Sequence, residues 1–200
     1  MTRWGMVIDL ARCVGCYACT VACKEENGTP AGVWFAPVYE REVGTFPAVK
    51  REFLPTLCMH CDDAPCLKAC PTGAISKRED GIVLIDQETC CGTRACIAAC
   101  PYGAITYVPA VETEFDAGPT PFEAATAKIL PGTSHKCNFG AHRVDEGNPE
   151  PACVQACPTN CRVFGDLEDP HSNVSHLIRV RNGKPPREEA GTRPAVYYLR

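Results

Sequence analysis

The sequence lacks a long apolar run and an excess of basic residues, and each absence excludes a class of function. No apolar segment approaches the length that a membrane-spanning helix needs. The formal net charge is −4, which offers no basic surface for nucleic acid. The first ten residues lack the charged and then apolar pattern of a secretory signal peptide. We therefore expect a soluble chain, and any export would depend on the signal of another subunit.

The sequence also lacks the motifs of an independent enzyme. It has no HExxH motif, no glycine-rich phosphate loop and no Ser-His-Asp arrangement. Because 18 Pro and 16 Gly interrupt 200 residues, long helices are not expected either. The length fits one domain or two closely fused halves. We expect short elements packed around something other than a large apolar core.

The sequence is instead rich in cysteine, with 16 in 200 residues. Most of them form four sets. The first set is Cys13, Cys16, Cys19 and Cys23; the second is Cys58, Cys61, Cys66 and Cys70; the third is Cys90, Cys96 and Cys100; and the fourth is Cys137, Cys153 and Cys157. The last cysteine of three sets precedes a proline, at Cys70-Pro71, Cys100-Pro101 and Cys157-Pro158. This Cys-Pro pair is typical of the iron–sulfur sites of bacterial ferredoxins.

Disulfides and zinc sites also produce dense cysteine, but both fit the spacing less well than clusters do. Disulfide frameworks occur in small secreted domains, but the first set confines its thiols to residues 13–23, too compact for separate disulfide partnerships. Paired CxxC motifs also bind tetrahedral zinc. The third cysteine in each turn and the Cys-Pro pairs favour clusters over disulfides and zinc.

An internal repeat predicts the architecture around these sets. Residues 70–75 (CPTGAI) recur as residues 100–105 (CPYGAI) and more faintly at residues 157–163, so each repeat is interpreted as half of a ferredoxin. Asp80-Gly81, just before the apolar residues 82–85, predicts a β-hairpin. We also expect a strand at residues 6–9 and short helices near residues 18–24, 64–69 and 95–99.

Two insertions and a tail lie outside the repeats. Residues 25–57 form either a surface that docks a partner or a cap over the clusters, because they contain the aromatic residues Trp34, Phe35, Tyr39, Phe46 and Phe53. Residues 107–135 are expected to be mostly loop, because they contain Pro109, Pro119, Pro121 and Pro131. Residues 169–200 predict a packed C-terminal strap, with a helix that starts at Asp169-Pro170 and an extended segment at residues 194–199.

Four phrases resemble the iron–sulfur subunit of the dimethyl sulfoxide reductase family, and the resemblance spans nearly the whole chain. They are residues 12–16 (RCVGC), 58–61 (CMHC), 164–167 (FGDL) and 191–198 (GTRPAVYY). The resemblance implies an α+β fold of two tandem ferredoxin-like modules, each for two 4Fe–4S clusters. Residues 1–24 and 136–168 would form the first module and residues 58–106 the second, with insertions at 25–57 and 107–135 and the strap at 169–200.

The resemblance also implies a function in anaerobic respiration. Relatives of this kind serve polysulfide, thiosulfate, tetrathionate and arsenate reductases. They pass single electrons between a molybdenum or tungsten pterin subunit and a quinone-linked membrane subunit or another carrier, and they have no catalysis of their own. Such a chain would be cytoplasmic or periplasmic and would reach the membrane through its partners. The alternatives are an accessory subunit of a hydrogenase or formate system, and a free polyferredoxin shuttle.

Ferredoxin spacing predicts the ligands, because the last cysteine of a set binds the neighbouring cluster. The adjacent second and third sets should exchange their last cysteines, and the resemblance implies the same for the first and fourth sets. Two sites are then complete: site one is Cys13, Cys16, Cys19 and Cys157, and site three is Cys58, Cys61, Cys66 and Cys100. Two lack a thiolate: site two is Cys23, Cys137 and Cys153, with Gly140 in fourth position, and site four is Cys70, Cys90 and Cys96, with Thr93 in fourth position.

The two incomplete sites leave the cluster type open. Respiratory nitrate reductases lack the cysteine that Thr93 replaces and carry a 3Fe–4S cluster there, so the resemblance implies the same for site four. Cys91 is the alternative fourth ligand of that site, and Cys161, His142 or a water or hydroxide is the candidate for site two. Cys91 and Cys161 are otherwise buried small residues without a metal role. We predict three to four clusters, mainly 4Fe–4S and one a candidate 3Fe–4S. We expect His60 to form a hydrogen bond to a sulfur or the backbone.

Overall fold

The computed structural model describes residues 1–111, 113, 118 and 120–200, and its elements are short. The helices are α1 (Ala18–Asn27), α2 (Pro65–Lys68), α3 (Ala95–Ala99), α4 (Pro121–Thr126), α5 (Ala141–Asp145), α6 (Ala152–Gln155) and α7 (Asn173–Arg181), with 3-10 turns η1 (Leu10–Arg12) and η2 (Glu188–Ala190). The strands are β1 (Trp4–Asp9), β2 (Val38–Thr45), β3 (Ala48–Pro55), β4 (Ile75–Lys77), β5 (Val83–Ile85), β6 (Thr106–Val108), β7 (Thr133–His135), β8 (Arg162–Asp166) and β9 (Val196–Leu199). In the described ranges no helix has the length and apolarity to cross a membrane.

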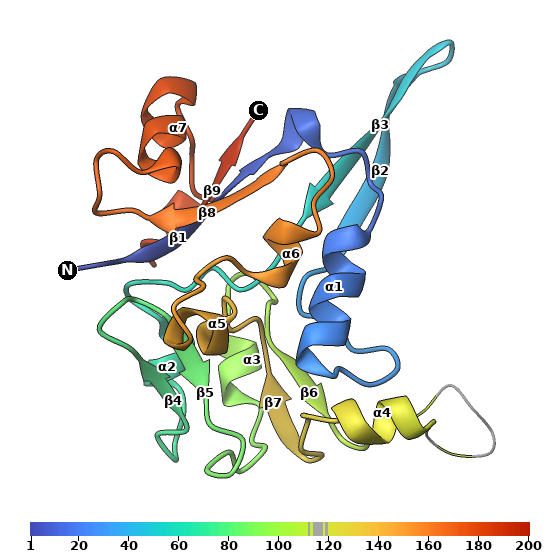
Figure 1. Ribbon diagram of the computed structural model, residues 1–200, viewed down its shortest axis with the longest axis vertical. Helices are drawn as coiled ribbons and strands as arrows, with labels where there is room; N and C mark the ends of the chain where they lie inside the picture. Colours follow the sequence, from blue (N-terminus) through green and yellow to red (C-terminus); the bar gives the residue numbers. More distant parts are fainter. Residues whose placement is uncertain (112, 114–117, 119) are drawn as a thin grey trace.

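A three-stranded sheet joins the two ends of the chain. Strand β1 lies in the middle, antiparallel to β8 and parallel to β9. Met6, Val7 and Ile8 of β1 are fully buried, and α7 packs on the sheet through Val174. Figure 1 shows this sheet and α7 at one end of the molecule. The strand predicted at residues 6–9 and the extended segment predicted at 194–199 are thereby confirmed.

In the described part of the chain the other strands form three two-stranded antiparallel pairs. The pair β4–β5 is the hairpin predicted from Asp80-Gly81, and Asp80 Oδ1 accepts a hydrogen bond from the backbone N–H of Ile82 at 3.2 Å. The pair β6–β7 brackets the second insertion. Helix α1 packs against α6, and α2 packs against α3. The helices predicted near residues 18–24, 64–69 and 95–99 correspond to α1, α2 and α3.

The first insertion forms the β2–β3 hairpin, which extends away from the body of the molecule (Figure 1). At its tip Phe46 is 88% exposed. At its base Phe53 packs so closely over Gly15 that a Cβ there would lie 2.2 Å from the ring. The base of the hairpin therefore covers a cysteine set, as one interpretation predicts, and the tip projects; docking of a partner stays a prediction.

One sequence expectation about the other peripheral segments is confirmed, and one is wrong in detail. The described residues of the second insertion are mostly loop, as expected, but they include α4, because Pro121 takes the first helical position and Thr120 forms a capping box with Glu123. Pro119, also used to predict loop there, lies outside the described residues. The tail helix α7 starts after Ser172 rather than at Asp169-Pro170, because Ser172 Oγ accepts the Ser175 N–H at 3.2 Å.

Candidate cluster-binding sites

All 16 cysteines are free thiols, so the chain is not a disulfide scaffold. Within the described part of the chain no group of three or more His, Cys, Asp or Glu side chains converges on a single metal ion. Thiolates that hold a cluster each bind a different iron, so they surround a space without converging on one point. The cysteines of this chain gather in this way around separate cavities.

The cavity of site three is lined by all of its predicted ligands, Cys58, Cys61, Cys66 and Cys100. Tyr102 closes one side of it, and its hydroxyl lies 2.5 Å from Thr192 Oγ1. Burial raises the pKa of Cys66 to about 12 and that of Cys61 to about 11. These thiols are therefore protonated at neutral pH until a metal displaces the protons.

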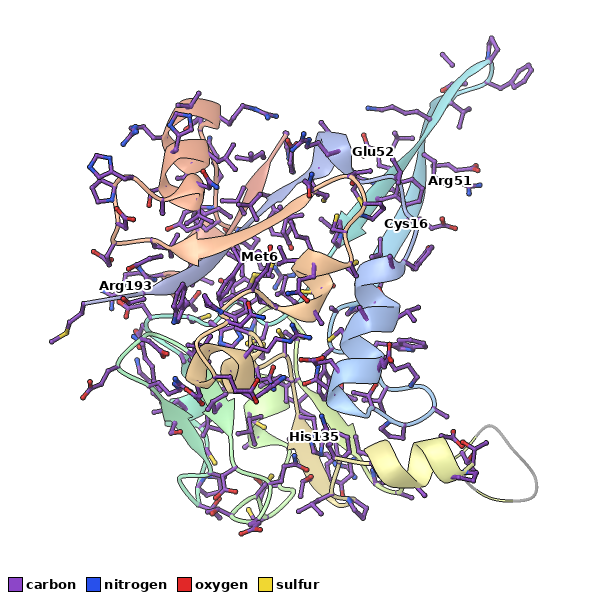
Figure 2. The ribbon with its side chains drawn as sticks, viewed as in Figure 1. Met6, Cys16, Arg51, Glu52, His135 and Arg193 are labelled. Carbon is purple, nitrogen blue, oxygen red and sulfur yellow. The ribbon has the colours of Figure 1, made fainter. Side chains whose placement is uncertain are left out.

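The cavity of site one is likewise lined by its predicted ligands, Cys13, Cys16, Cys19 and Cys157. Val38 and Pro55, from the base of the β2–β3 hairpin, line it too. Figure 2 labels Cys16 at this base, with Arg51 and Glu52 on the hairpin beyond it. The base of the first insertion thus forms part of the wall of site one.

Cys161 also lines the cavity of site one, although the sequence made it a candidate for site two. Its backbone N–H donates to Cys157 Sγ at 3.2 Å. Burial and the nearby Cys13 and Cys157 raise the pKa of its thiol to about 12. For Cys157 itself, burial disfavours the thiolate, but hydrogen bonds from the Arg162 and Cys161 backbone and the Thr159 hydroxyl outweigh burial and lower its pKa. Position therefore associates Cys161 with site one.

The cavity of site four is lined by Cys70, Cys90 and Cys96 together with Cys91 and Thr93. Burial disfavours the charged form of Cys70, but hydrogen bonds from the Thr72 side chain and neighbouring backbone lower its pKa overall. Cys91 is exposed, so the view that it is a buried small residue is wrong. Thr93, which occupies the fourth position, and Cys91, the alternative fourth ligand, therefore both lie at this site.

The loops of site one and site four have the same conformation. Residues 13–19 and 90–96 share one pattern of exposure, position by position. Gly15 and Gly92 have φ of 66° and 69°, and the next residue but one in each loop, Tyr17 and Arg94, has φ of 59° and 60°. Each of these last residues caps a helix that carries a buried cysteine at its second position.

This equivalence assigns positions to the residues of site four. Thr93 stands where Cys16 stands in site one. Cys91 stands where Val14 stands, and Val14 is 58% exposed. In backbone position Thr93 therefore corresponds to Cys16 and Cys91 to the exposed Val14, while both Thr93 and Cys91 line the cavity of site four.

Site two brings together three buried cysteines, Cys23, Cys137 and Cys153. Burial and the nearby Cys153 raise the pKa of Cys23 to about 12, and burial with Cys23 and Cys153 raises that of Cys137 well above its usual value. Asn27 Nδ2 donates to Cys23 Sγ at 3.5 Å, and the Phe139 N–H donates to Cys137 Sγ at 3.4 Å. The three thiols are thus mutually close, and two of them already accept hydrogen bonds.

The fourth position of site two has no thiol. Gly140 has φ of 66° and precedes α5. His142, a candidate replacement, instead pairs with Glu26 Oε1 through Nε2 at 2.6 Å and is 41% exposed. Neither His142 nor Cys161 therefore takes the arrangement expected of a fourth ligand at this site.

His60 behaves as the sequence predicts. Its Nδ1 accepts a hydrogen bond from the Val83 N–H at 3.1 Å, and its ring stacks on Phe139 with centroids 3.8 Å apart. Burial and the charge of Lys136 lower the pKa of the ring well below its usual value, so it is neutral. His60 thus fills the junction between the second and fourth sets and supports their turns.

Sequence reasoning missed two buried cations, Arg162 and Lys136. Arg162 is 2% exposed and Lys136 is 6% exposed. Lys136 Nζ donates to the backbone carbonyls of Val83 and Cys137. Their neighbours in the sequence could have drawn attention to them, because Lys136 precedes Cys137 and Arg162 follows Cys161. In the sheet, Arg162 lies opposite the buried Ile8.

Comparison with protein-family descriptions and with individual proteins gives one consistent result. A 4Fe–4S dicluster domain matches residues 49–117 and 110–167, and a 4Fe–4S binding domain matches residues 4–25. The matched segments include residues from all four cysteine sets.

Individual relatives match over almost the full chain. The arsenate respiratory reductase iron–sulfur subunit of Shewanella sp. (strain ANA-3) is 42% identical, covering 99% of this chain and 96% of the relative. A selenate reductase subunit of Mesobacillus selenatarsenatis is 43% identical, covering 98% and 72%. A sulfite dehydrogenase subunit of Allochromatium vinosum is 41% identical, covering 100% and 83%.

Proposed function

The chain belongs to the iron–sulfur electron-transfer subunits of the dimethyl sulfoxide reductase family, and on this premise we propose how it holds its clusters and what it connects. When bound, iron–sulfur clusters accept and release single electrons at potentials set by cluster type, hydrogen bonding to sulfur and exposure. The residues of this chain space the clusters and tune them. We infer that the chain relays electrons between a molybdenum or tungsten pterin subunit and a quinone-linked membrane subunit or other carrier.

The observation that carries the proposal is the gathering of the predicted ligands. The four predicted ligands of site one line one cavity and those of site three line another, drawn in each case from two different cysteine sets. The raised thiol pKa values of Cys61 and Cys66 at site three are what burial produces before metal is bound. We propose a 4Fe–4S cluster at each of the two sites.

We propose that the chain forms two ferredoxin-like modules. Residues 1–24 and 136–168 form the first, and residues 58–106 form the second. The contacts of α1 with α6 and of α2 with α3 support this division, because each contact joins two cysteine sets that share ligands. The equivalent loops at residues 13–19 and 90–96 support it as well.

At the incomplete sites we propose different outcomes. Site four, with Thr93 in the position of Cys16, holds a 3Fe–4S cluster through Cys70, Cys90 and Cys96. Site two holds a cluster through Cys23, Cys137 and Cys153, with a fourth ligand that is not a protein thiolate. Three to four clusters then form the relay, mainly of the 4Fe–4S type.

We propose that the tip of the β2–β3 hairpin docks the catalytic subunit. A two-stranded ribbon is marginally stable by itself in water and is stabilised by packing against a partner. Phe46 at the tip and Val49 beside it on β3 are 88% and 46% exposed, and neither lines the cavity of site one.

Anaerobic purification from the native host tests the cluster proposal first. We expect iron and acid-labile sulfide in the protein and a 3Fe–4S signal in low-temperature electron paramagnetic resonance of the oxidised form. Stoichiometric zinc without labile sulfide would overturn the assignment. Cys91→Ser is the matched control for any ligand variant, because it removes an exposed thiol from the outward position of the same loop.

Co-purification tests the partner proposal. We expect the native protein to elute with a much larger pterin-containing subunit. A variant with Phe46→Ser should lose part of that association while keeping its iron. A native protein that elutes as a stable, active monomer would instead identify a free electron shuttle.

A further inference from the structure

Arg162 is a buried charge without a complete set of partners. It begins β8 and lies opposite Ile8 of β1, at 2% exposure. Its NH1 contacts Met6 Sδ at 3.8 Å, while Nε and NH2 have no hydrogen-bond acceptor among the described residues. Buried polar groups are nearly always hydrogen-bonded in folded proteins. Two unpaired donors on one guanidinium therefore require an explanation.

The groups that interact electrostatically with Arg162 are mostly cysteines of the cluster sites. Its strongest charge partners are Cys153 and Cys19, followed by Tyr198 and Cys161. Cys153 is a proposed ligand of site two and Cys19 of site one, and Arg162 itself lines the site-one cavity. Arg162 thus lies in the wall of site one and interacts electrostatically with a proposed ligand of site two.

Among the described residues no hydrogen bond to Arg162 Nε or NH2 offsets the burial of its charge, and a buried cation without such partners is costly. Thiolate-bound clusters would supply both the missing negative charge and sulfur acceptors for the free donors.

We propose that Arg162 is a positioning and tuning residue that places one fixed positive charge between sites one and two and raises the reduction potentials of both clusters. A nearby positive charge stabilises the reduced, more negative form over the oxidised form. This inference rests on the ligand sets proposed for sites one and two. Its test is therefore chosen to distinguish the loss of the clusters from a change in their potentials.

Three variants provide the test. Arg162→Gln removes the charge and keeps a side chain of similar reach, whereas Arg162→Lys keeps the charge. Arg179→Gln is the matched control, because it makes the same chemical change on α7, away from the cluster sites. Iron and labile sulfide are measured first, and each cluster's midpoint potential is then measured by redox titration followed by electron paramagnetic resonance.

We expect Arg162→Gln to lower the potentials of the clusters at sites one and two, each by an amount that corresponds to at least a tenfold change in the reduction equilibrium, which is about 59 mV for a one-electron couple. The other clusters should stay at wild-type values, and Arg162→Lys should recover most of the shift. Full iron in Arg162→Gln with potentials no different from those of Arg179→Gln would overturn the proposal. A lower melting temperature without a change in potential would identify a purely structural residue and overturn it as well.

If Arg162→Gln does not retain its clusters, Arg162→Lys tests whether the positive charge is what matters. Full iron and near wild-type potentials in Arg162→Lys would then support the role of charge. Loss of iron from Arg162→Lys too would overturn it, since the shape of arginine and not its charge would be required. Wild-type protein without labile sulfide would overturn the proposed function itself, which is a separate result visible before any variant is compared.

Discussion

The loops at residues 13–19 and 90–96 differ at the ligand position while keeping the same backbone. One carries Cys16 and the other Thr93, yet both have two positive φ angles at matching positions and the same order of exposed and buried residues. The conformation therefore depends on the glycine and on the helix that follows, and it does not depend on the fourth thiol. A site of this kind can lose one thiolate and keep the frame that holds the other three.

The turns at residues 58–61 and 137–140, one from each proposed module, can be compared in the same way. His60 and Phe139 both have positive φ, 42° and 57°, and their rings stack against each other. The next residue is Cys61 in one turn and Gly140 in the other. At the position equivalent to Cys16 the second loop thus carries a hydroxyl, and at the position equivalent to Cys61 the second turn carries no side chain.

The largest effect is expected when the turn at residues 58–61 is given the glycine that the turn at residues 137–140 carries at Gly140. Cys61→Gly reproduces the ligand set of site two at site three. We expect loss of the site-three 4Fe–4S cluster or its conversion to 3Fe–4S, because a charged thiolate is removed. Iron analysis and electron paramagnetic resonance measure this change. A variant with the iron content and spectrum of the Cys91→Ser control would contradict the assignment of Cys61.

The converse change completes the loop of site four. Thr93→Cys places a thiol where Cys16 stands in site one, and we expect the 3Fe–4S signal to disappear as a 4Fe–4S cluster forms. Cys91→Ser should leave the signal unchanged, because Cys91 occupies the outward position of Val14. Low-temperature electron paramagnetic resonance of the oxidised proteins measures both. Loss of the signal in Cys91→Ser alone would show that Cys91 is a ligand.

A smaller effect is expected from strain in the loop backbone. Gly15→Ala forces a side chain into a positive φ and against the Phe53 ring, and we expect it to lower the free energy of unfolding by about 1–3 kcal/mol. Gly73→Ala is the control, because Gly73 has φ of 71° with no atom within 4 Å of an added Cβ. Denaturant unfolding under anaerobic conditions measures both. Equal losses in the two variants would show that Phe53 does not press on the loop.

The smallest effect concerns the ion pair beside site two. Hydrogen bonds from Arg143 lower the pKa of Glu26 from 4.5 to about 2. The resulting stabilisation is fully present above pH 4.5 and is lost as the pH falls toward 2. Glu26→Gln should therefore be less stable than the wild type by about 1 kcal/mol at neutral pH, with the difference vanishing near the lowered pKa. A difference that is constant with pH would exclude this pairing.

The local elements could be predicted because their causes lie close together in sequence. Asp80-Gly81 closes its hairpin through a contact two residues away, and Cys-x2-Cys spacing defines each loop. The start of α7 was predicted wrongly because Asp169-Pro170 and Ser172 both resemble helix starts, and the Ser172 hydroxyl forms the cap. The β2–β3 hairpin was missed because aromatic residues in that insertion mark neither strand nor loop by themselves.

The sequence alone determined that this chain holds iron–sulfur clusters, since ligand type and spacing are properties of short segments. Tertiary structure alone placed Cys161 at site one, because the segment that leads into strand β8 carries it back beside Cys13 from far along the chain. It also showed that Thr93, and not Cys91, occupies the loop position equivalent to that of Cys16, and that two donor atoms of the buried Arg162 lack acceptors among the described residues. Burial and proximity between distant segments are products of packing, so they do not appear in the order of the residues.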